Sequence, residues 1–248
     1  MSHIIAIAGK GGTGKTTIAA LLVRIIKEKK LGSILAIDAD PNSNLGEYLG
    51  VPAAATIGTI LDGISGNPGK IPAGMTKERF IEYEVQTAVA ESEGFDLLTM
   101  GRPEGPGCYC YVNNVLRNAA AKLIGEYDYV IIDNEAGLEH FSRRTTRSAD
   151  SLVIVSDASS AGLRAVRRIN DLVGELKIKI NRAFLMINRF SEDLPAGKLS
   201  GIKPQYLGFI PQDPEIESLS QDGGSVFDLK NNAVSVISLR KLGERIWN

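Results

Sequence analysis

The chain has 248 residues, of which 44% are hydrophobic and 23% charged, a composition that excludes fibrous, collagen-like and wholly disordered proteins. With 28 basic and 29 acidic residues the formal net charge is -1, so no overall field attracts nucleic acid or anionic lipid, and we expect neither partner. The first apolar run, Ile4–Ala8, is too short for a membrane span and follows no basic segment, so a cytoplasmic protein is expected.

Strand and helix patterns alternate along the chain. The apolar run Ile4–Ala8, the helical periodicity of Lys15–Lys30 and the apolar run Ser33–Asp38 predict a βαβ unit. Further strands are predicted at Phe95–Thr99, Tyr129–Asp133, Ser151–Ser156, Ala183–Asn188 and Tyr206–Ile210, and further helices at Val112–Glu126, Ala161–Leu176 and Val234–Trp247. Continuous apolar strands separated by helices indicate an α/β fold, with a doubly wound, mostly parallel sheet and helices on both faces.

The stretch Val51–Gly74 is the most irregular part of the chain, because it is rich in Gly, Pro and Ala. We interpret it as a surface excursion after the second strand and not as a linker, so a single domain over residues 1–248 is expected. The last helical pattern, Val234–Trp247, is interpreted as a packed helix and not as a membrane-binding amphipathic one.

The segment Gly9–Thr16 reads GKGGTGKT and matches the phosphate-binding loop pattern, between a strand and a helix as the mechanism requires. Glycines let backbone N–H groups converge on phosphates at the positive end of the helix. Lys15 is expected to face solvent and to reach the β- and γ-phosphates, while the Thr16 hydroxyl binds Mg²⁺ and Thr17 contacts the α-phosphate. The residues expected to bind ATP or ADP here are Gly11, Gly12, Thr13, Gly14, Lys15, Thr16 and Thr17.

A second lysine, Lys10, lies inside this loop, where an ordinary phosphate-binding loop needs no charge. With it, the loop resembles the deviant Walker A motif of the MinD, ParA and nitrogenase-iron-protein class of ATPases. The resemblance implies a doubly wound P-loop fold in which Lys10 reaches across a homodimer to the partner's nucleotide, and in which hydrolysis waits on dimerisation. A solvent-exposed loop charge is the alternative for Lys10.

Three aspartates follow predicted strands, where carboxylates project beside the phosphate loop. The resemblance implies that Asp40 orients or deprotonates the attacking water. Asp133 ends an apolar run as a Walker B aspartate does and would hold Mg²⁺ through a water, with Asp38 as a supporting member of the Mg²⁺ shell. Gly137 suits a backbone that moves when the γ-phosphate leaves. Each aspartate has helix capping as its alternative.

Two further residues at strand ends are candidates for base recognition. Asn188 follows a predicted strand and is similar to the family's purine-reading asparagine, and Pro211 is similar to the residue of its adenine-packing loop. Simple turn residues are the alternative for both.

The only two cysteines, Cys108 and Cys110, are separated by one residue after Gly-Pro-Gly. In an extended segment residues two apart face the same way, so both sulfurs can meet one ion. Two thiolates leave a metal under-coordinated, but a two-fold axis would supply two more, a set suited to Ni²⁺ or Zn²⁺. Packed or redox-active thiols are the alternative.

Together with the segments Asp38–Leu45 and Asp133–His140, the chain resembles the CooC and AcsF family of accessory ATPases that help insert nickel into carbon monoxide dehydrogenase. The resemblance implies a homodimeric, Mg²⁺-dependent ATPase that binds nickel between subunits, with carbon monoxide dehydrogenase or a related nickel enzyme as its client. His140 is interpreted as a switch-segment residue, or as a packed or solvated histidine, and not as a metal ligand. An iron–sulfur electron-transfer ATPase and a positioning ATPase that binds membrane or DNA stay as alternative functions.

Overall fold

The computed structural model describes residues 2–52, 55–66, 71–101, 110–135 and 148–247. Its strands are β1 (His3–Gly9), β2 (Ile34–Ala39), β3 (Ala90–Ser92), β4 (Phe95–Thr99), β5 (Tyr129–Asn134), β6 (Ser148–Ser156), β7 (Lys179–Asn188) and β8 (Gln205–Ile210). Its helices are α1 (Lys15–Glu28), α2 (Leu45–Leu49), α3 (Ile57–Gly66), α4 (Lys77–Thr87), α5 (Cys110–Ile124), α6 (Ser160–Glu175), α7 (Ala196–Leu199), α8 (Pro214–Asp222), the 3-10 turn η3 (Val226–Asp228) and α9 (Val234–Trp247).

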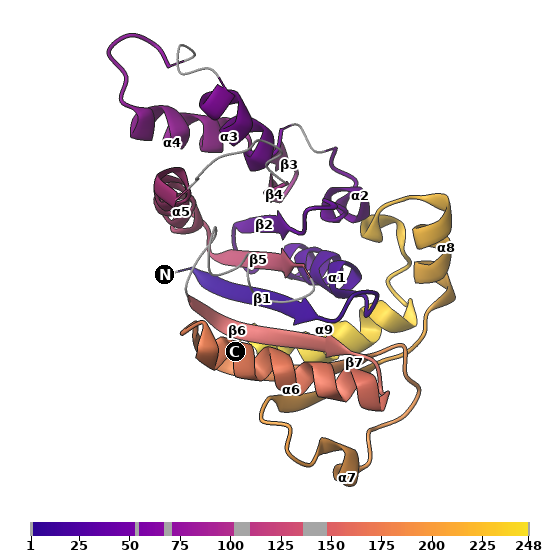
Figure 1. Ribbon diagram of the computed structural model, residues 1–248. Helices are drawn as coiled ribbons and strands as arrows, with labels where there is room; N and C mark the ends of the chain where they lie inside the picture. Colours follow the sequence, from indigo (N-terminus) through magenta and orange to yellow (C-terminus); the bar gives the residue numbers. More distant parts are fainter. Residues whose placement is uncertain (1, 53–54, 67–70, 102–109, 136–147, 248) are drawn as a thin grey trace.

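Within these residues the strands form one sheet, in the order β3-β4-β2-β5-β1-β6-β7-β8. Every neighbouring pair is parallel except β3 and β4, which are antiparallel. The carboxyl ends of the parallel strands therefore meet at one edge, and in Figure 1 the arrowheads point toward the side on which α2 and α8 lie. In open α/β sheets this edge is where ligands bind.

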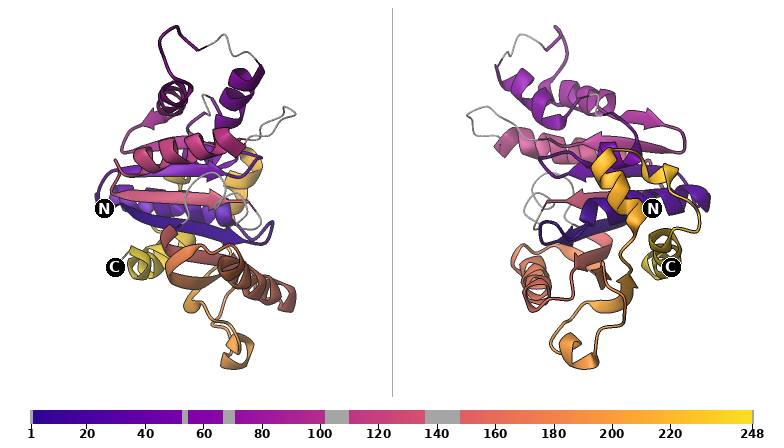
Figure 2. Two further views of the ribbon diagram at one scale, coloured as in Figure 1. Left: turned by 60° about the vertical axis from the view of Figure 1, so that its left-hand side comes forward. Right: turned by 90° about the vertical axis from the view of Figure 1, so that its right-hand side faces the viewer.

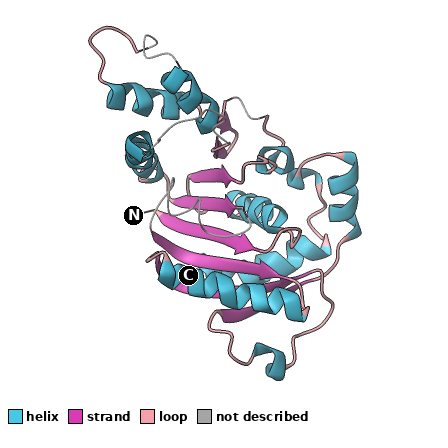
Figure 3. Cartoon of the chain, viewed as in Figure 1, coloured by secondary structure: helices cyan, strands magenta, loops and turns pink. Residues whose placement is uncertain are grey.

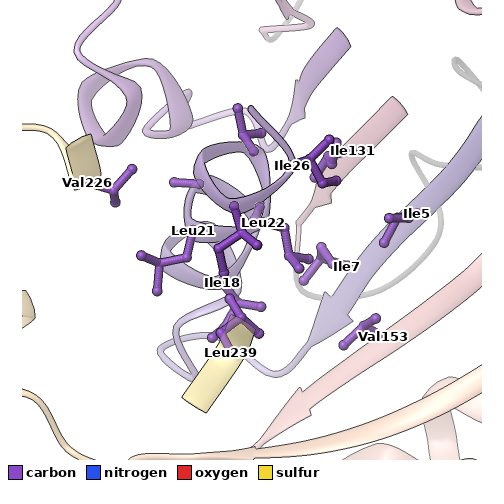
Figure 4. Packing of buried hydrophobic residues seen from close by; sticks show 14 of the residues in the cluster. Ile5, Ile7, Ile18, Leu21, Leu22, Ile26, Ile131, Val153, Val226 and Leu239 are labelled. Carbon is purple, nitrogen blue, oxygen red and sulfur yellow. The ribbon is translucent and has the colours of Figure 1, made fainter. Parts of the chain in front are cut away.

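Helices cover both faces of the sheet, and each face has its own hydrophobic core (Figure 3). On one face, α1 and α9 pack on the inner strands, and Figure 4 shows Ile18 and Leu22 of α1 beside Ile7 of β1, with Leu239 of α9 close by. On the other face, buried residues of α4, α5 and α6 pack on the alternate strand positions. The strand interiors are buried on both sides, which explains their continuous apolar sequences.

The predicted fold class is confirmed, and the predicted elements occur with bounds that differ by a few residues. The surface excursion proposed for Val51–Gly74 is wrong in part, because residues 57–66 form α3, and Ile57 is buried. Thr56 starts this helix: its hydroxyl accepts a hydrogen bond from the Thr59 N–H at 3.2 Å. Three glycines in α3 hide the helical periodicity from a sequence pattern.

Further elements were not predicted, namely α2, α4, β3, α7, α8 and η3. Figure 2 shows α3 and α4, in purple, beyond the β3–β4 side of the sheet, at the opposite end from α7, in orange. The predicted packing of the last helix is confirmed, since α9 buries Val236, Leu239 and Ile246. No helix within the described ranges is long and apolar enough to cross a membrane.

The two outer strands of the sheet are irregular. At one side β3 has only three residues and runs antiparallel to β4. At the other side the pairing of β7 with β8 shifts register between Leu185 and Met186, and the Arg245 guanidinium of α9 donates to the Leu207 carbonyl at 3.2 Å. Neither outer strand therefore presents a long regular row of backbone groups.

Candidate nucleotide and magnesium site

The phosphate loop connects the end of β1 to the start of α1. Gly14 precedes α1 in a left-handed conformation (φ 88°) and no side chain caps the helix, so its first N–H groups are available to an anion. Gly9 also needs to be glycine, because a Cβ there would lie 2.2 Å from the Val155 carbonyl oxygen. The Thr13 hydroxyl donates to the Lys10 carbonyl at 2.8 Å and closes the loop on itself.

The two lysines of the loop have different environments. Lys10 is exposed, which fits both a contact with a partner and the alternative of a solvated loop charge. Lys15 is only 7% exposed, so the expectation that it faces solvent is wrong. Lys15 is the first residue of α1, and its ammonium is 3.5 Å from the Lys10 carbonyl oxygen of the same loop. The cation is therefore already placed where phosphates would be bound.

Asp38 and Asp133 are direct neighbours in the register of β2 and β5. Both carboxylates are buried, and the Thr16 side chain lies beside Asp133. Burial raises the pKa of Asp133 to about 7; the nearby Thr16 side chain opposes the shift, the Asp38 charge adds to it and the Lys15 charge opposes it. Predicted residues from three separate segments are thus brought together at the carboxyl edge of the sheet.

Asp38 organises the loop that follows β2. Its carboxylate accepts hydrogen bonds from the Leu45 N–H at 2.8 Å and from the Asp40 N–H at 3.1 Å, and burial raises its pKa to about 6. These are the contacts of the capping alternative, since Leu45 is the first residue of α2. A role for Asp38 in the magnesium shell stays a prediction.

Asp40 is half-buried in the same loop. One of its carboxylate oxygens accepts from the backbone N–H and the side-chain amide of Asn42, both at 2.9 Å. The next residue, Ser43, adopts a left-handed conformation (φ 54°) and donates its N–H to the Asp40 carbonyl at 3.0 Å. The Asp40 carboxylate is therefore held in a defined orientation by its own turn.

The oxygen atoms of Thr16 and Asp133 are suited to a magnesium ion. Mg²⁺ prefers oxygen ligands and keeps several waters; the Thr16 hydroxyl can bind the ion directly, and the Asp133 carboxylate can hold one of its waters. Asp133 Oδ1 is buried and has no hydrogen-bond partner among the described residues, as expected of an atom that would accept from water bound to the ion.

The raised pKa gives a prediction for the protein free of nucleotide and magnesium. A carboxyl whose pKa is higher in the folded than in the unfolded chain stabilises the fold at low pH, and this contribution is lost as the pH rises through about 7. Asp133→Asn keeps the shape without the charge, so we expect it to be more stable than the parent at pH 8, by on the order of 2–4 kcal/mol, and nearly equal below pH 4. Urea unfolding at both pH values measures this, and an Asp133→Asn variant less stable at pH 8 would contradict it.

A cavity of about 300 Å³ opens beside the phosphate loop. Thr17 of α1, Asn188 at the end of β7 and Pro211 after β8 all line it, so three residues predicted to contact the nucleotide share one cavity. Its remaining walls come from α8, from Asp213 and from the first turn of α9; they include Ile216, Glu217, Ser220 and Ser235. The cavity is beside the loop, where a base attached to loop-bound phosphates would lie, and we refer to it as the base cavity.

Asn188 is 9% exposed and its orientation is fixed by the phosphate loop. Its Nδ2 donates to the Thr13 carbonyl at 2.8 Å. A carbonyl can only accept, so the amide nitrogen has to face Thr13; its second N–H and the amide oxygen are left for a ligand. The spacing is close, since a Cβ on Gly14 would lie 2.4 Å from Asn188 Nδ2.

Sequence reasoning missed Asp213, which joins two helices at the cavity. One carboxylate oxygen accepts from the Glu215 N–H at 3.0 Å and caps α8; the other accepts from the Ser235 N–H at 3.0 Å and its hydroxyl at 2.6 Å. An available signal was the Asp-Pro-Glu sequence, because an aspartate before Pro214 is typical of a helix start.

Several predicted site residues lie outside the described segments or at the end of one. Cys108, Gly137 and His140 lie outside the described residues. Cys110 is the first residue of α5, so the extended segment assumed for both cysteines does not hold at Cys110. Among the described residues no group of three or more His, Cys, Asp or Glu side chains is placed to bind a metal ion.

Comparison with known proteins shows the family of the chain. Residues 4–226 match the CobQ/CobB/MinD/ParA nucleotide binding domain (CbiA) family. An uncharacterised ATP-binding protein of Methanocaldococcus jannaschii is 39% identical over 250 residues, 99% of this chain and 98% of that protein. The carbon monoxide dehydrogenase accessory protein CooC of Rhodospirillum rubrum is 30% identical over 265 residues, 96% of this chain and 97% of CooC. The septum site-determining protein MinD of Pyrococcus horikoshii, solved in complex with Mg-ADP, has the same fold, with a TM-score of 0.72 at 22% identity over 99% of this chain and 96% of its own.

Proposed function

The chain belongs to the CobQ/CobB/MinD/ParA nucleotide-binding family, and from this membership we propose that it is a Mg²⁺-dependent ATPase that works as a homodimer and delivers nickel to a client enzyme. The observation that carries the ATPase proposal is the convergence of Lys15, Thr16 and Asp133 at the open start of α1. A cation, two oxygen ligands and free helix N–H groups are the parts that hold a magnesium nucleotide.

The site residues have separate roles in binding. The N–H groups of residues 11–16 and the Lys15 ammonium would hold the β- and γ-phosphates. The Thr16 hydroxyl would bind Mg²⁺ directly, and Asp133 would hold a water of its shell. Bound Mg²⁺ neutralises charge that develops on the phosphate oxygens during transfer. Burial raises the pKa of Asp133, and bound Mg²⁺ would favour its ionised form.

Asp40 is the residue proposed to position the attacking water. Its neighbours support this role, because Asn42 and the Asp38 carboxylate hold the loop in which it lies. A carboxylate fixed in this way can accept a proton from water and orient its lone pair toward the γ-phosphorus. Lys10, exposed on the tip side of the loop, is proposed to complete the site of the partner subunit, which would make hydrolysis depend on dimerisation.

The base cavity is proposed to select adenine. One N–H of Asn188 Nδ2 is used by the Thr13 carbonyl, and Asn188 Oδ1 is the acceptor that we propose for the base. An acceptor at that point pairs with the 6-amino group of adenine and opposes the 6-oxo group of guanine. Competition between ATP and GTP for the purified protein measures this preference.

The nickel role rests on the cysteine pair and on the likeness to CooC, the carbon monoxide dehydrogenase accessory protein. Cys108 and Cys110 from two subunits would provide four thiolates for one Ni²⁺ or Zn²⁺ on the two-fold axis. Cys110 begins α5, whose other end reaches the core through Ala119 and Leu123, so a metal there would be held against a packed helix. Carbon monoxide dehydrogenase or a related nickel enzyme is the proposed client.

Cysteine substitution tests this role. A Cys110→Ser change removes two of four sulfurs from a dimer, so tight Ni²⁺ binding is expected to disappear while ATP binding persists. Equilibrium dialysis with Ni²⁺ and with Zn²⁺, with and without ATP, run beside light scattering, gives metal stoichiometry and mass together. We expect one metal per parent dimer, and Ser218→Ala on α8 serves as a distant control.

Three results would contradict the shared site. One metal per monomer, or undiminished affinity in Cys110→Ser, would move the cysteines to a redox or packing role. A parent that binds neither metal but hydrolyses ATP would leave the positioning function, as in the relative MinD of Bacillus subtilis, which is 26% identical. Co-sedimentation with liposomes and with DNA then distinguishes a membrane from a nucleic-acid surface.

A further inference from the structure

Two successive side chains at the end of β7 donate to two successive carbonyls of the phosphate loop. Asn188 Nδ2 donates to the Thr13 carbonyl at 2.8 Å, and the Arg189 guanidinium donates to the Gly12 carbonyl at 3.3 Å. Both side chains also line the base cavity. The wall of the cavity and the tip of the phosphate loop are therefore connected by direct hydrogen bonds.

The tip of the loop has little else to hold it. Gly11 and Gly12 are exposed, and a Cβ built on either one would meet no atom within 4 Å. The loop's own hydrogen bonds, from the N–H and the hydroxyl of Thr13, both end on the Lys10 carbonyl and not on Gly12. The contact from Arg189 is therefore what fixes the position of the Gly12 carbonyl, because packing does not.

The backbone of Arg189 is in an unfavourable conformation. Its φ is 56°, in the left-handed region that costs free energy for a residue with a Cβ and that glycine or asparagine adopts more easily. The turn is fixed on both sides, because Asn188 pairs with Ile210 and the Phe190 N–H donates to the Ile210 carbonyl at 3.1 Å. Lys30 and Lys177 share this conformation, so at Arg189 it is the contact with Gly12, together with the backbone, that points to a role for the side chain.

We propose that Arg189 is a positioning residue for the nucleotide, which braces the tip of the phosphate loop from the wall of the base cavity. The inference rests on the proposed nucleotide binding at this site. The guanidinium fixes the Gly12 carbonyl, so the neighbouring N–H groups keep the orientation that phosphates need, and its positive charge adds to the attraction for them. Through Arg189, the affinity for the phosphates therefore depends on the wall of the base cavity.

The test replaces Arg189 by asparagine. Asn tolerates the left-handed conformation, so Arg189→Asn is expected to unfold at the same or a higher temperature than the parent. Its affinity for Mg²⁺–ADP and for Mg²⁺–tripolyphosphate, which has no base, is expected to fall by about threefold to tenfold, measured by calorimetry. Arg189→Lys, which keeps a donor and a charge, is expected to recover part of the loss.

A matched control lies at the other end of the same strand. Lys177 precedes β7, is exposed and has a left-handed φ of 52°, so Lys177→Asn makes the same kind of change far from the site. It is expected to leave both affinities unchanged. A structural role alone for Arg189 would lower the unfolding temperature and would not weaken ligand binding in a folded variant.

The outcomes separate the possible failures. If Arg189→Asn binds tripolyphosphate as the parent does but ADP more weakly, Arg189 is a base contact and the bracing role is wrong. If both affinities are unchanged, Arg189 has no part in nucleotide binding. If the parent itself binds neither ligand, the proposed function fails, and this inference fails with it.

Discussion

Replacing Lys15 by alanine is expected to lower the affinity for Mg²⁺–ATP by a factor on the order of 100 or more, because a charge-assisted contact to two phosphates is lost. The side chain is almost fully buried and its one contact to the loop, at 3.5 Å to the Lys10 carbonyl, is long. A buried cation with only a long hydrogen bond contributes little to the free energy of unfolding. The nucleotide-free variant should therefore unfold at the same or a higher temperature. Calorimetry with ATP and a thermal melt make the two measurements.

The control for Lys15→Ala comes from the same helix region. Lys29 follows the last turn of α1 and forms an exposed ion pair with Glu244, which contributes little to stability. Lys29→Ala should bind ATP as the parent does. Unchanged ATP affinity in Lys15→Ala would remove the assignment of the phosphate loop, whereas a large drop in its unfolding temperature would show that the buried lysine supports the fold.

Asp40→Asn is expected to slow ATP hydrolysis by roughly 10²- to 10⁴-fold, the usual contribution of a general base, with little change in ATP affinity. The amide keeps the shape of the carboxylate and an acceptor for the Asn42 N–H, so the turn should survive. Because the variant binds ATP and does not turn it over, it should accumulate as the dimer. Single-turnover hydrolysis and light scattering with ATP measure both effects.

Glu47→Gln is the control variant for Asp40→Asn. It removes one exposed negative charge from α2, the helix that follows the same loop. Its turnover should match that of the parent. Near-normal turnover in Asp40→Asn would end the catalytic role of Asp40. If that variant were monomeric with ATP while the parent dimerised, Asp40 would act in assembly and not in the chemical step.

Much of this arrangement could be predicted from the sequence because it depends on strong local patterns. Continuous apolar runs identified the inner strands, and a motif with fixed spacing placed Lys15 and Thr16 at a helix start. The rule that parallel strands end at one edge then brought Asp133 and Asn188 toward the same site. Each inference needed only periodicity, a motif or topology.

The remaining features depend on tertiary contacts that no local pattern reports. The glycines of α3 hide its helical pattern, and burial of Ile57 stabilises the helix. Lys15 was expected to face solvent, because a sequence motif does not report how deeply a side chain is buried. The capping contacts of Asp38 require knowledge of where α2 begins. In the sequence Arg189 is one charge after a predicted strand, and its contact to Gly12 is evident only in the structure.

The irregular outer strands of the sheet have a consequence for the behaviour of the protein at high concentration. An open sheet with a long, flat outer strand is a template on which another chain can add by backbone pairing, the first step toward aggregates. Here β3 is too short to serve, and on β8 the register shift and the Arg245 guanidinium on the Leu207 carbonyl interrupt the row of acceptors. Oligomer formation is thereby directed away from edge-to-edge pairing and toward surfaces that side chains can specify.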